Sequence, residues 1–166
     1  MKYPMFLILT CLIACEAPVA PASKESNVIR YDRPDASILK GASVPAGKQL
    51  FFSSGQVTNP VYPDAPEKSL QRYGNTYEQS IGTLQKLEGV LKEAGLGLDD
   101  VVYLGVFIAP DPREEDQIDF DAWFRAYGEF FNNEENPVKT ARSTIGVAAL
   151  ARPYLLVEVE AIAAYD

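Results

Sequence analysis

The clearest chemical pattern in the chain is an arginine and two glutamates near its C-terminal end. Arg142 lies in a β-branched run over 140–150, and Glu158 and Glu160 alternate with apolar residues in a second run over 155–163. Such alternation is typical of a strand with one apolar face. A planar, permanently charged guanidinium beside a carboxylate is suited to binding a small organic acid. A cross-strand ion pair at a sheet edge would give the same pattern.

The two runs are joined by a short link that contains Pro153. Proline lacks a backbone donor and suits a connection better than a central strand, so the pattern predicts a β-hairpin. We expect the apolar members of both runs, such as Ile145, to face the core. The opposite face of the hairpin would then carry Arg142, Glu158 and Glu160 together.

Composition limits the classes of function. The chain has 166 residues, of which 47% are hydrophobic, which fits one globular domain with a sizeable core. Its formal net charge is −8, so most of the surface would repel a phosphate backbone, and we expect no nucleic-acid partner. The sequence contains no histidine, which removes the usual acid–base residue and the ordinary zinc sites. We expect neither a metal nor a cofactor.

The N-terminal residues resemble an export signal. Lys2 precedes an apolar run over 5–14, which is too short to span a bilayer, and the run ends at Leu12-Ile13-Ala14-Cys15. These four residues resemble a bacterial lipobox, in which the cysteine is lipidated and becomes the first residue. The alternative is an ordinary cysteine beside a standard cleavage site.

This resemblance predicts three segments: a lipoprotein signal peptide at 1–14, the lipidated Cys15 with a flexible Pro/Ala/Ser-rich tether at 15–27, and a folded domain at 28–166. The expected location is that of an exported bacterial lipoprotein on the periplasmic side. Glu16, following the cysteine, favours anchoring in the outer membrane.

The folded part is predicted to be an α+β layer in which two helices cover one face of a mixed sheet. Apolar stripes at helical spacing predict the two helices, and Gly95 is expected to end the first. The elements follow in the order strand 28–31, strand 48–53, helix 77–91, strand 101–109, helix 119–131, strand 140–150 and strand 155–163. The helix-free face of the sheet needs a cover, which a second copy of the chain would provide.

Several motifs resemble the Rid proteins, the YjgF-like reactive-intermediate deaminases. They are Phe52-Ser53-Ser54-Gly55-Gln56, Glu93-Ala94-Gly95-Leu96, Phe130-Phe131, Ala141-Arg142-Ser143 and Val157-Glu158-Val159-Glu160-Ala161. The resemblance spans about 28–163. It implies a chorismate-mutase-like fold and a trimeric barrel with three sites between subunits. It also implies hydrolysis of reactive enamines and imines of small 2-keto acids to the keto acid and ammonia.

The resemblance also implies roles for single residues. Arg142 falls on the arginine that binds the substrate carboxylate, and Glu158 on the glutamate that positions water. Ser54 matches a serine of the pocket wall, and Thr144 stands where the family carries a cysteine, so both are substrate-binding candidates. Phe124 replaces the family's asparagine, and no residue near Gly41 matches its tyrosine.

These departures leave a second hypothesis, a non-catalytic trimeric binding protein for small carboxylates. Endoribonuclease activity, which has been described for some family members, is disfavoured by the acidic charge and the lack of histidine.

Overall fold

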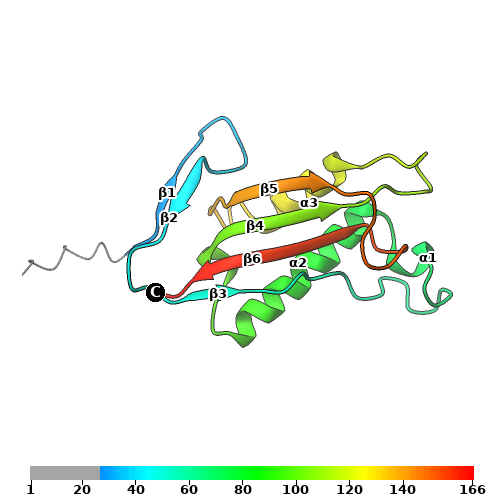
Figure 1. Cartoon of the computed structure of the whole chain (residues 1–166), viewed down its shortest axis with the longest axis horizontal. Helices are drawn as coiled ribbons and strands as arrows, with labels where there is room; N and C mark the ends of the chain where they lie inside the picture. The colour runs from blue at the N-terminus through cyan, green and yellow to red at the C-terminus, as the bar shows by residue number, and fades with distance from the viewer. Residues whose placement is uncertain (1–26) are drawn as a thin grey trace, which may run out of the picture.

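A mixed sheet of four strands organises the chain, and its helices lie on one face (Figure 1). The computed structural model describes residues 27–166. The order across the sheet is β3-β6-β4-β5, where the strands are β3 (Leu50–Phe52), β4 (Val101–Ile108), β5 (Ala141–Gly146) and β6 (Val157–Ala164). A separate antiparallel pair, β1 (Ile29–Tyr31) and β2 (Gly41–Ser43), extends from one end of the sheet (Figure 1).

The two main helices begin and end at residues suited to those positions. Helix α2 (Thr76–Glu93) starts with a capping box between Asn75 and Glu78. It ends at Gly95, which has a φ of 76° and, together with Leu96, makes the paired hydrogen bonds of a Schellman motif. Helix α3 (Phe120–Phe130) is capped by the carboxylate of Asp119. The short α1 (Leu70–Tyr73) and the 3₁₀ turn η1 (Leu98–Asp100) complete the helical part of the described chain.

The core lies between the two long helices and the sheet. Helix α2 contributes Leu84, Leu87 and Leu91, and α3 contributes Trp123 and Tyr127, all with 1% or less of their surface exposed. The sheet adds alternate residues of its two central strands, namely Leu104, Val106, Ile108, Val157, Val159, Ala161 and Ala163. The predicted α+β class, with helices on one face of a mixed sheet, is confirmed.

The predicted β-hairpin is wrong. Strands β5 and β6 are not neighbours, because β4 lies between them, parallel to β5 and antiparallel to β6. The apolar run of β4 fits this central position, since it provides backbone donors and acceptors to a strand on each side. The two C-terminal runs follow one another in sequence, and each is apolar enough to pair with β4. The sequence predicts the strand at 101–109 but does not reveal that it lies between these two runs.

The predicted orientation of Arg142 is also wrong. Arg142 is in register with Leu104 of β4, whose side chain is fully buried against the helices. Paired residues of neighbouring strands point to the same face, so Arg142 and Thr144 face the helices, whereas Ser143 and Ile145 point to the open face. The expectation that Ile145 belongs to the core therefore fails, and 48% of its surface is exposed.

The predicted signal peptide and most of the predicted tether lie outside the described residues. Between residues 27 and 166, no helix has the length and apolar character needed to cross a bilayer.

Candidate functional site

Arg142 lies at the outer edge of the sheet, against three aromatic rings of α3. Its guanidinium carbon is 4.1 Å from the ring centre of Tyr127, 5.4 Å from that of Phe124 and 6.0 Å from that of Trp123. Strand β5 is the edge strand of the sheet, and the backbone N–H of Leu39 donates to the carbonyl oxygen of Thr140 just before it. Cation–π contacts of this kind hold a guanidinium in place without neutralising its charge.

Tyr127 forms the best-anchored wall of this cluster. Its ring is stacked on Phe131 at 5.0 Å between ring centres, and its hydroxyl accepts a hydrogen bond from the backbone N–H of Thr140 at 3.2 Å. Thr140 lies two residues before Arg142, so the same side chain that supports the guanidinium also fixes the start of its strand. The arginine is thus held by a rigid aromatic platform.

The charge of Arg142 is poorly compensated within the protomer. Its Nη1 atom is buried and has no hydrogen-bond partner among the described residues. Burial lowers the pKa of the Arg142 guanidinium from its usual value, an effect that Tyr127 partly opposes. An arginine remains protonated at neutral pH even so, and a desolvated, unpaired guanidinium binds an incoming carboxylate more strongly than a hydrated one. The alternative prediction, a cross-strand ion pair with Glu158 or Glu160, is wrong for the described chain.

Glu158 belongs to a different part of the molecule. It is in register with Phe107 of β4, and its side chain lies over Gly55, where an added Cβ atom would come within 1.9 Å of Oε1 of the glutamate. Gly55 follows Ser54 in the bend after β3, and Gln56 resumes pairing with Val159 of β6. Ser54 and Glu158 therefore belong to the same part of the sheet, and the glycine leaves room for the carboxylate.

Glu160 occupies the same open face as Glu158. Its side chain lies over Gly105 of β4, where a Cβ atom would meet Oε1 at 2.6 Å. Beside it, Tyr103 donates a hydrogen bond from its hydroxyl to Ser143 at 2.8 Å. Apolar side chains surround these polar groups, and Phe52, at 66% exposed, is the most exposed of them.

The predicted site residues thus form two half-sites in one protomer. Half-site A contains Arg142 and Thr144 on the helix-facing side of β5, with Phe124 beside them. Half-site B contains Glu158 on the opposite face, with Ser54 next to Gly55 in the bend after β3, at the β3–β6 side of the sheet. Two strand spacings, about 10 Å, separate the halves across the sheet, and three residues of register add about another 10 Å along it.

Sequence reasoning misses the aromatic platform under Arg142. The helical spacing of Trp123, Phe124 and Tyr127 indicates a core-facing stripe, and Trp123 and Tyr127 are indeed buried. Their second role follows from the parallel pairing of β5 with β4, which places Arg142 on the side of α3. Phe124 is the residue from which the sequence could have predicted this role. It directly follows Trp123, so its side chain lies away from the centre of the core-facing stripe.

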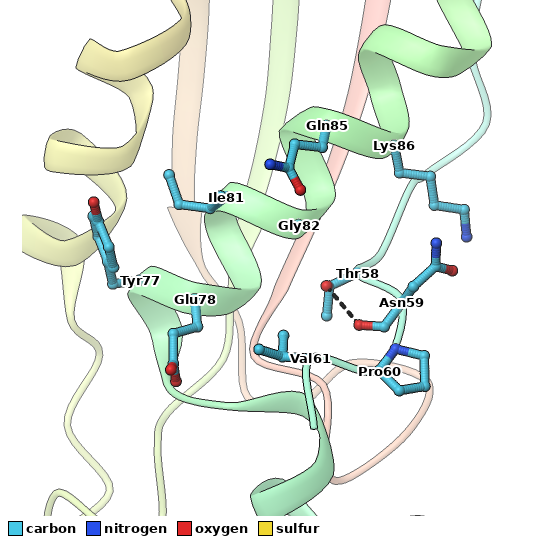
Figure 2. A pocket seen from close by; sticks show the side chains of 10 residues that line it. All are labelled: Thr58, Asn59, Pro60, Val61, Tyr77, Glu78, Ile81, Gly82, Gln85 and Lys86. Carbon is cyan, nitrogen blue, oxygen red and sulfur yellow. Dashed lines mark hydrogen bonds between the residues drawn. The ribbon is translucent and has the colours of Figure 1, made fainter. Parts of the chain in front are cut away.

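A groove on the other long helix contains none of these residues (Figure 2). It has a volume of about 450 Å³ and lies between the loop 58–61 and the first half of α2. Thr58 packs closely on Gly82, because a Cβ atom added to Gly82 would lie 2.1 Å from the hydroxyl oxygen of Thr58. The described residues contain no cluster of three or more side chains able to hold a metal ion.

Comparison with known proteins connects this fold with one family. Residues 41–165 match the family model described as endoribonuclease L-PSP. A RutC family protein of Synechocystis is 32% identical over 118 residues, covering 71% of this chain and 80% of the relative. This chain belongs to the Rid family, which includes the RutC and YjgF proteins. The resemblance predicted from the sequence motifs is confirmed at the level of the family.

Solved structures agree with this assignment. The crystal structure of E. coli TdcF with bound serine has a TM-score of 0.54 and 28% identity, covering 74% of this chain and 85% of TdcF. A Rid family protein of unknown function from Yersinia pestis gives a TM-score of 0.62 at 24% identity, covering 84% of this chain and 99% of the other, which supports the fold. The chain thus has the fold of the YjgF-like proteins.

Proposed function

We propose that this Rid protein hydrolyses reactive imines, and the enamines that tautomerise to them, of small 2-keto acids. The observation that carries the proposal is Arg142, a desolvated guanidinium at the sheet edge that the described chain leaves without an ion-pair partner. A partly buried cationic group of this kind is a candidate for a binding site, and a carboxylate is its natural ligand. The serine present in the TdcF structure is a small molecule that carries such a carboxylate.

The proposed reaction is the addition of water to a C=N bond. Glu158 orients a water molecule and accepts one of its protons as the oxygen bonds to the imine carbon, while the nitrogen is protonated. Glu158 then returns its proton to the amine nitrogen of the carbinolamine and accepts the hydroxyl proton, so that the C–N bond breaks, ammonia leaves and the C=O bond of the keto acid forms. General base catalysis of this type contributes about 10²–10⁴ in rate. Charge-assisted hydrogen bonds from Arg142 to the acid contribute about 1.5–3 kcal/mol and hold the imine in place.

This mechanism requires a second copy of the chain. Within one protomer Arg142 and Glu158 point to opposite faces of the sheet, so they do not act on one small molecule. A homotrimer in which the open face of one copy covers the β5 edge of the next would join half-site A to half-site B. Burial of the exposed Phe52 and Ile145 would favour such an assembly.

Ammonia release from freshly generated 2-iminobutanoate or 2-aminoacrylate tests the proposal. The wild-type chain should accelerate release, and Arg142→Lys should lose most of this activity together with affinity for 2-oxobutanoate, because lysine lacks the bidentate fork. Glu158→Gln should retain 2-oxobutanoate binding and lose turnover. Activity of Arg142→Lys equal to that of the wild type would contradict the site.

A binding protein for small carboxylates is the second candidate. The observation that favours it is Phe124, which stands beside Arg142 where the family motif carries an asparagine. An asparagine donates and accepts hydrogen bonds, whereas a phenyl ring offers no polar group to a reacting imine. In this case the wild-type chain and Glu158→Gln would bind 2-oxobutanoate equally well, and neither would accelerate ammonia release.

We also propose that the protein is exported and anchored by a lipid at Cys15 on the periplasmic side of the outer membrane. The proposal rests on the Leu12-Ile13-Ala14-Cys15 sequence after an apolar run. Wild-type protein should partition with membranes and carry the mass of a lipid, and Cys15→Ser should release it or leave an uncleaved precursor. Wild-type protein recovered without lipid in the soluble fraction would contradict the anchor.

A further inference from the structure

Half-site A carries an apolar strip next to its charge, and this strip bears on the kind of acid that binds there. We propose that the preferred ligand of Arg142 is a 2-keto or 2-imino acid with an aromatic or branched apolar side chain, and that Phe124 determines this preference. The inference rests on the proposed function and specifies its substrate class.

Phe124 is the one ring of the aromatic platform that offers a surface to a ligand. Trp123 and Tyr127 are at most 1% exposed, whereas 44% of Phe124 is exposed. Its ring centre lies 5.4 Å from the guanidinium carbon of Arg142. A carboxylate bound to this guanidinium has oxygens about 2.7–2.9 Å from its nitrogens, so an acid that approaches along the exposed side of Phe124 brings its first carbons against the ring.

The apolar surface continues from Phe124 along the edge of the sheet. Gly146 lies four residues beyond Arg142 on the same face of β5, and a Cβ atom there would be 2.6 Å from Cδ1 of Ile118 and 3.4 Å from the ring of Phe120. Phe120 precedes Phe124 by one helical turn, so α3 runs antiparallel to β5 at this edge. The strip therefore extends about 13 Å from a cationic end at Arg142 to an apolar end at Gly146.

One polar side chain of β5 lies between the two ends of this strip. Thr144, between Arg142 and Gly146, carries a hydroxyl beside a methyl group. Because Thr144 is in register with Val106, it points to the same face as Arg142, and its hydroxyl offers one hydrogen-bonding group to a ligand bound along the strip. A short acid such as 2-oxobutanoate would contact Arg142 and Thr144 but would leave Phe120 and Ile118 uncovered. An acid with a phenyl or isobutyl group would cover them.

Calorimetric titration of the full chain with 2-oxobutanoate and with phenylpyruvate tests the inference. We expect phenylpyruvate to bind about tenfold more tightly, a modest share of the gain available when an apolar side chain is buried. Phe124→Asn should reduce this ratio to about one, because it weakens phenylpyruvate binding more than 2-oxobutanoate binding. Because Phe124 is partly exposed, we expect the variant to fold, and its thermal unfolding midpoint should lie close to that of the wild type.

Two controls separate this preference from binding through the ring alone and from binding through the charge alone. 2-Phenylethanol, which has the ring without the carboxylate, should not bind measurably, and Arg142→Lys should weaken both acids together. Equal affinity of the wild type for the two acids, or an unchanged ratio in Phe124→Asn, would overturn the preference and leave the proposed function intact. If neither acid binds to the wild type, the proposed function fails and the inference fails with it.

Discussion

Arg142 and Glu158 project from opposite faces of one sheet, the first toward the aromatic rings of α3 and the second over Gly55. Strand β4 separates their strands, so no rotamer change in a single protomer brings the guanidinium and the carboxylate together. If both groups act on one substrate, each site combines residues of two copies.

This relationship predicts complementation between two inactive variants. Arg142→Lys and Glu158→Gln should each have low deaminase activity, and trimers assembled from a mixture should regain part of it. With equal amounts and random assembly, about one quarter of the sites would combine an intact arginine with an intact glutamate from the adjacent copy. Ammonia release after co-refolding measures this fraction. Activity that stays at the level of the separate variants would show that each site uses one chain.

Gly55 should be essential for turnover but dispensable for acid binding. A Cβ atom at this position would come within 1.9 Å of Oε1 of Glu158, so Gly55→Ala must displace the carboxylate. We expect a loss of ammonia release with little change in the affinity for 2-oxobutanoate, since Arg142 lies in the other half-site. Gly89→Ala on α2 is the matched control, because nothing lies within 4 Å of its added methyl group and alanine favours a helix. Normal turnover in Gly55→Ala would exclude a role for the present position of Glu158.

The sequence predicts the layers of this fold more reliably than its pairing. The stripe of Leu84, Leu87 and Leu91 and the apolar run of β4 identify a helix and a central strand, because periodicity and burial are properties of each segment alone. Strand order depends on contacts between distant segments. The insertion of β4 between β5 and β6 therefore could not be derived from the alternation of residues in either C-terminal run.

The same limit applies to the site. Alternation shows that Arg142 and Ile145 point to opposite faces, but the expectation that the more apolar set faces the core is wrong. It fails because Ile145 lies on an open face with exposed apolar groups, while the charged Arg142 is accommodated by rings that bind a cation. The closeness of Glu158 to Gly55 follows from the pairing of β3 with β6, because Gly55 lies in the bend after β3 and Glu158 lies on β6.

The open face of the sheet should be the contact surface between copies. Ile145 is 48% exposed on this face, and a lysine there would place a charge in an apolar interface. Light scattering on the full chain in detergent should give three chains per particle for the wild type and smaller particles for Ile145→Lys. Val61→Lys, which changes another exposed apolar residue on the loop that borders α2, is the control and should remain trimeric. A monomeric wild type at micromolar concentration would contradict the shared site.

Asp111 should make the stability of the fold depend on acid pH. Its carboxylate is buried, and Arg113 donates to it from Nε at 2.9 Å and from Nη2 at 2.7 Å, while Nη2 also reaches the backbone oxygen of Gly74 at 3.0 Å. Burial raises the pKa of the Asp111 carboxyl, but the hydrogen bonds and charge of Arg113 lower it by a larger amount. The pKa of this carboxyl therefore lies below its usual value. The ionised form is therefore the one that the folded state stabilises.

The direction of the pH dependence follows from this lowered pKa. Above the pKa of an unfolded aspartate, about 3.9, the interaction contributes its full stabilisation, and this contribution is lost as the pH falls through the lower pKa of the folded state. Asp111→Asn should reduce the free energy of unfolding by about 1–3 kcal/mol at neutral pH, because one partner of a buried charge-assisted pair is removed. The difference from the wild type should be smaller at about pH 3, because an unfolded aspartate is largely protonated there whereas the lowered pKa of the folded carboxyl opposes protonation. Urea unfolding at the two pH values measures both differences.

Asp166→Asn, which alters an exposed carboxylate 3.5 Å from Lys48, is the control and should change stability little at either pH. A difference between Asp111→Asn and wild type that is the same at both pH values would contradict the assignment of this ion pair.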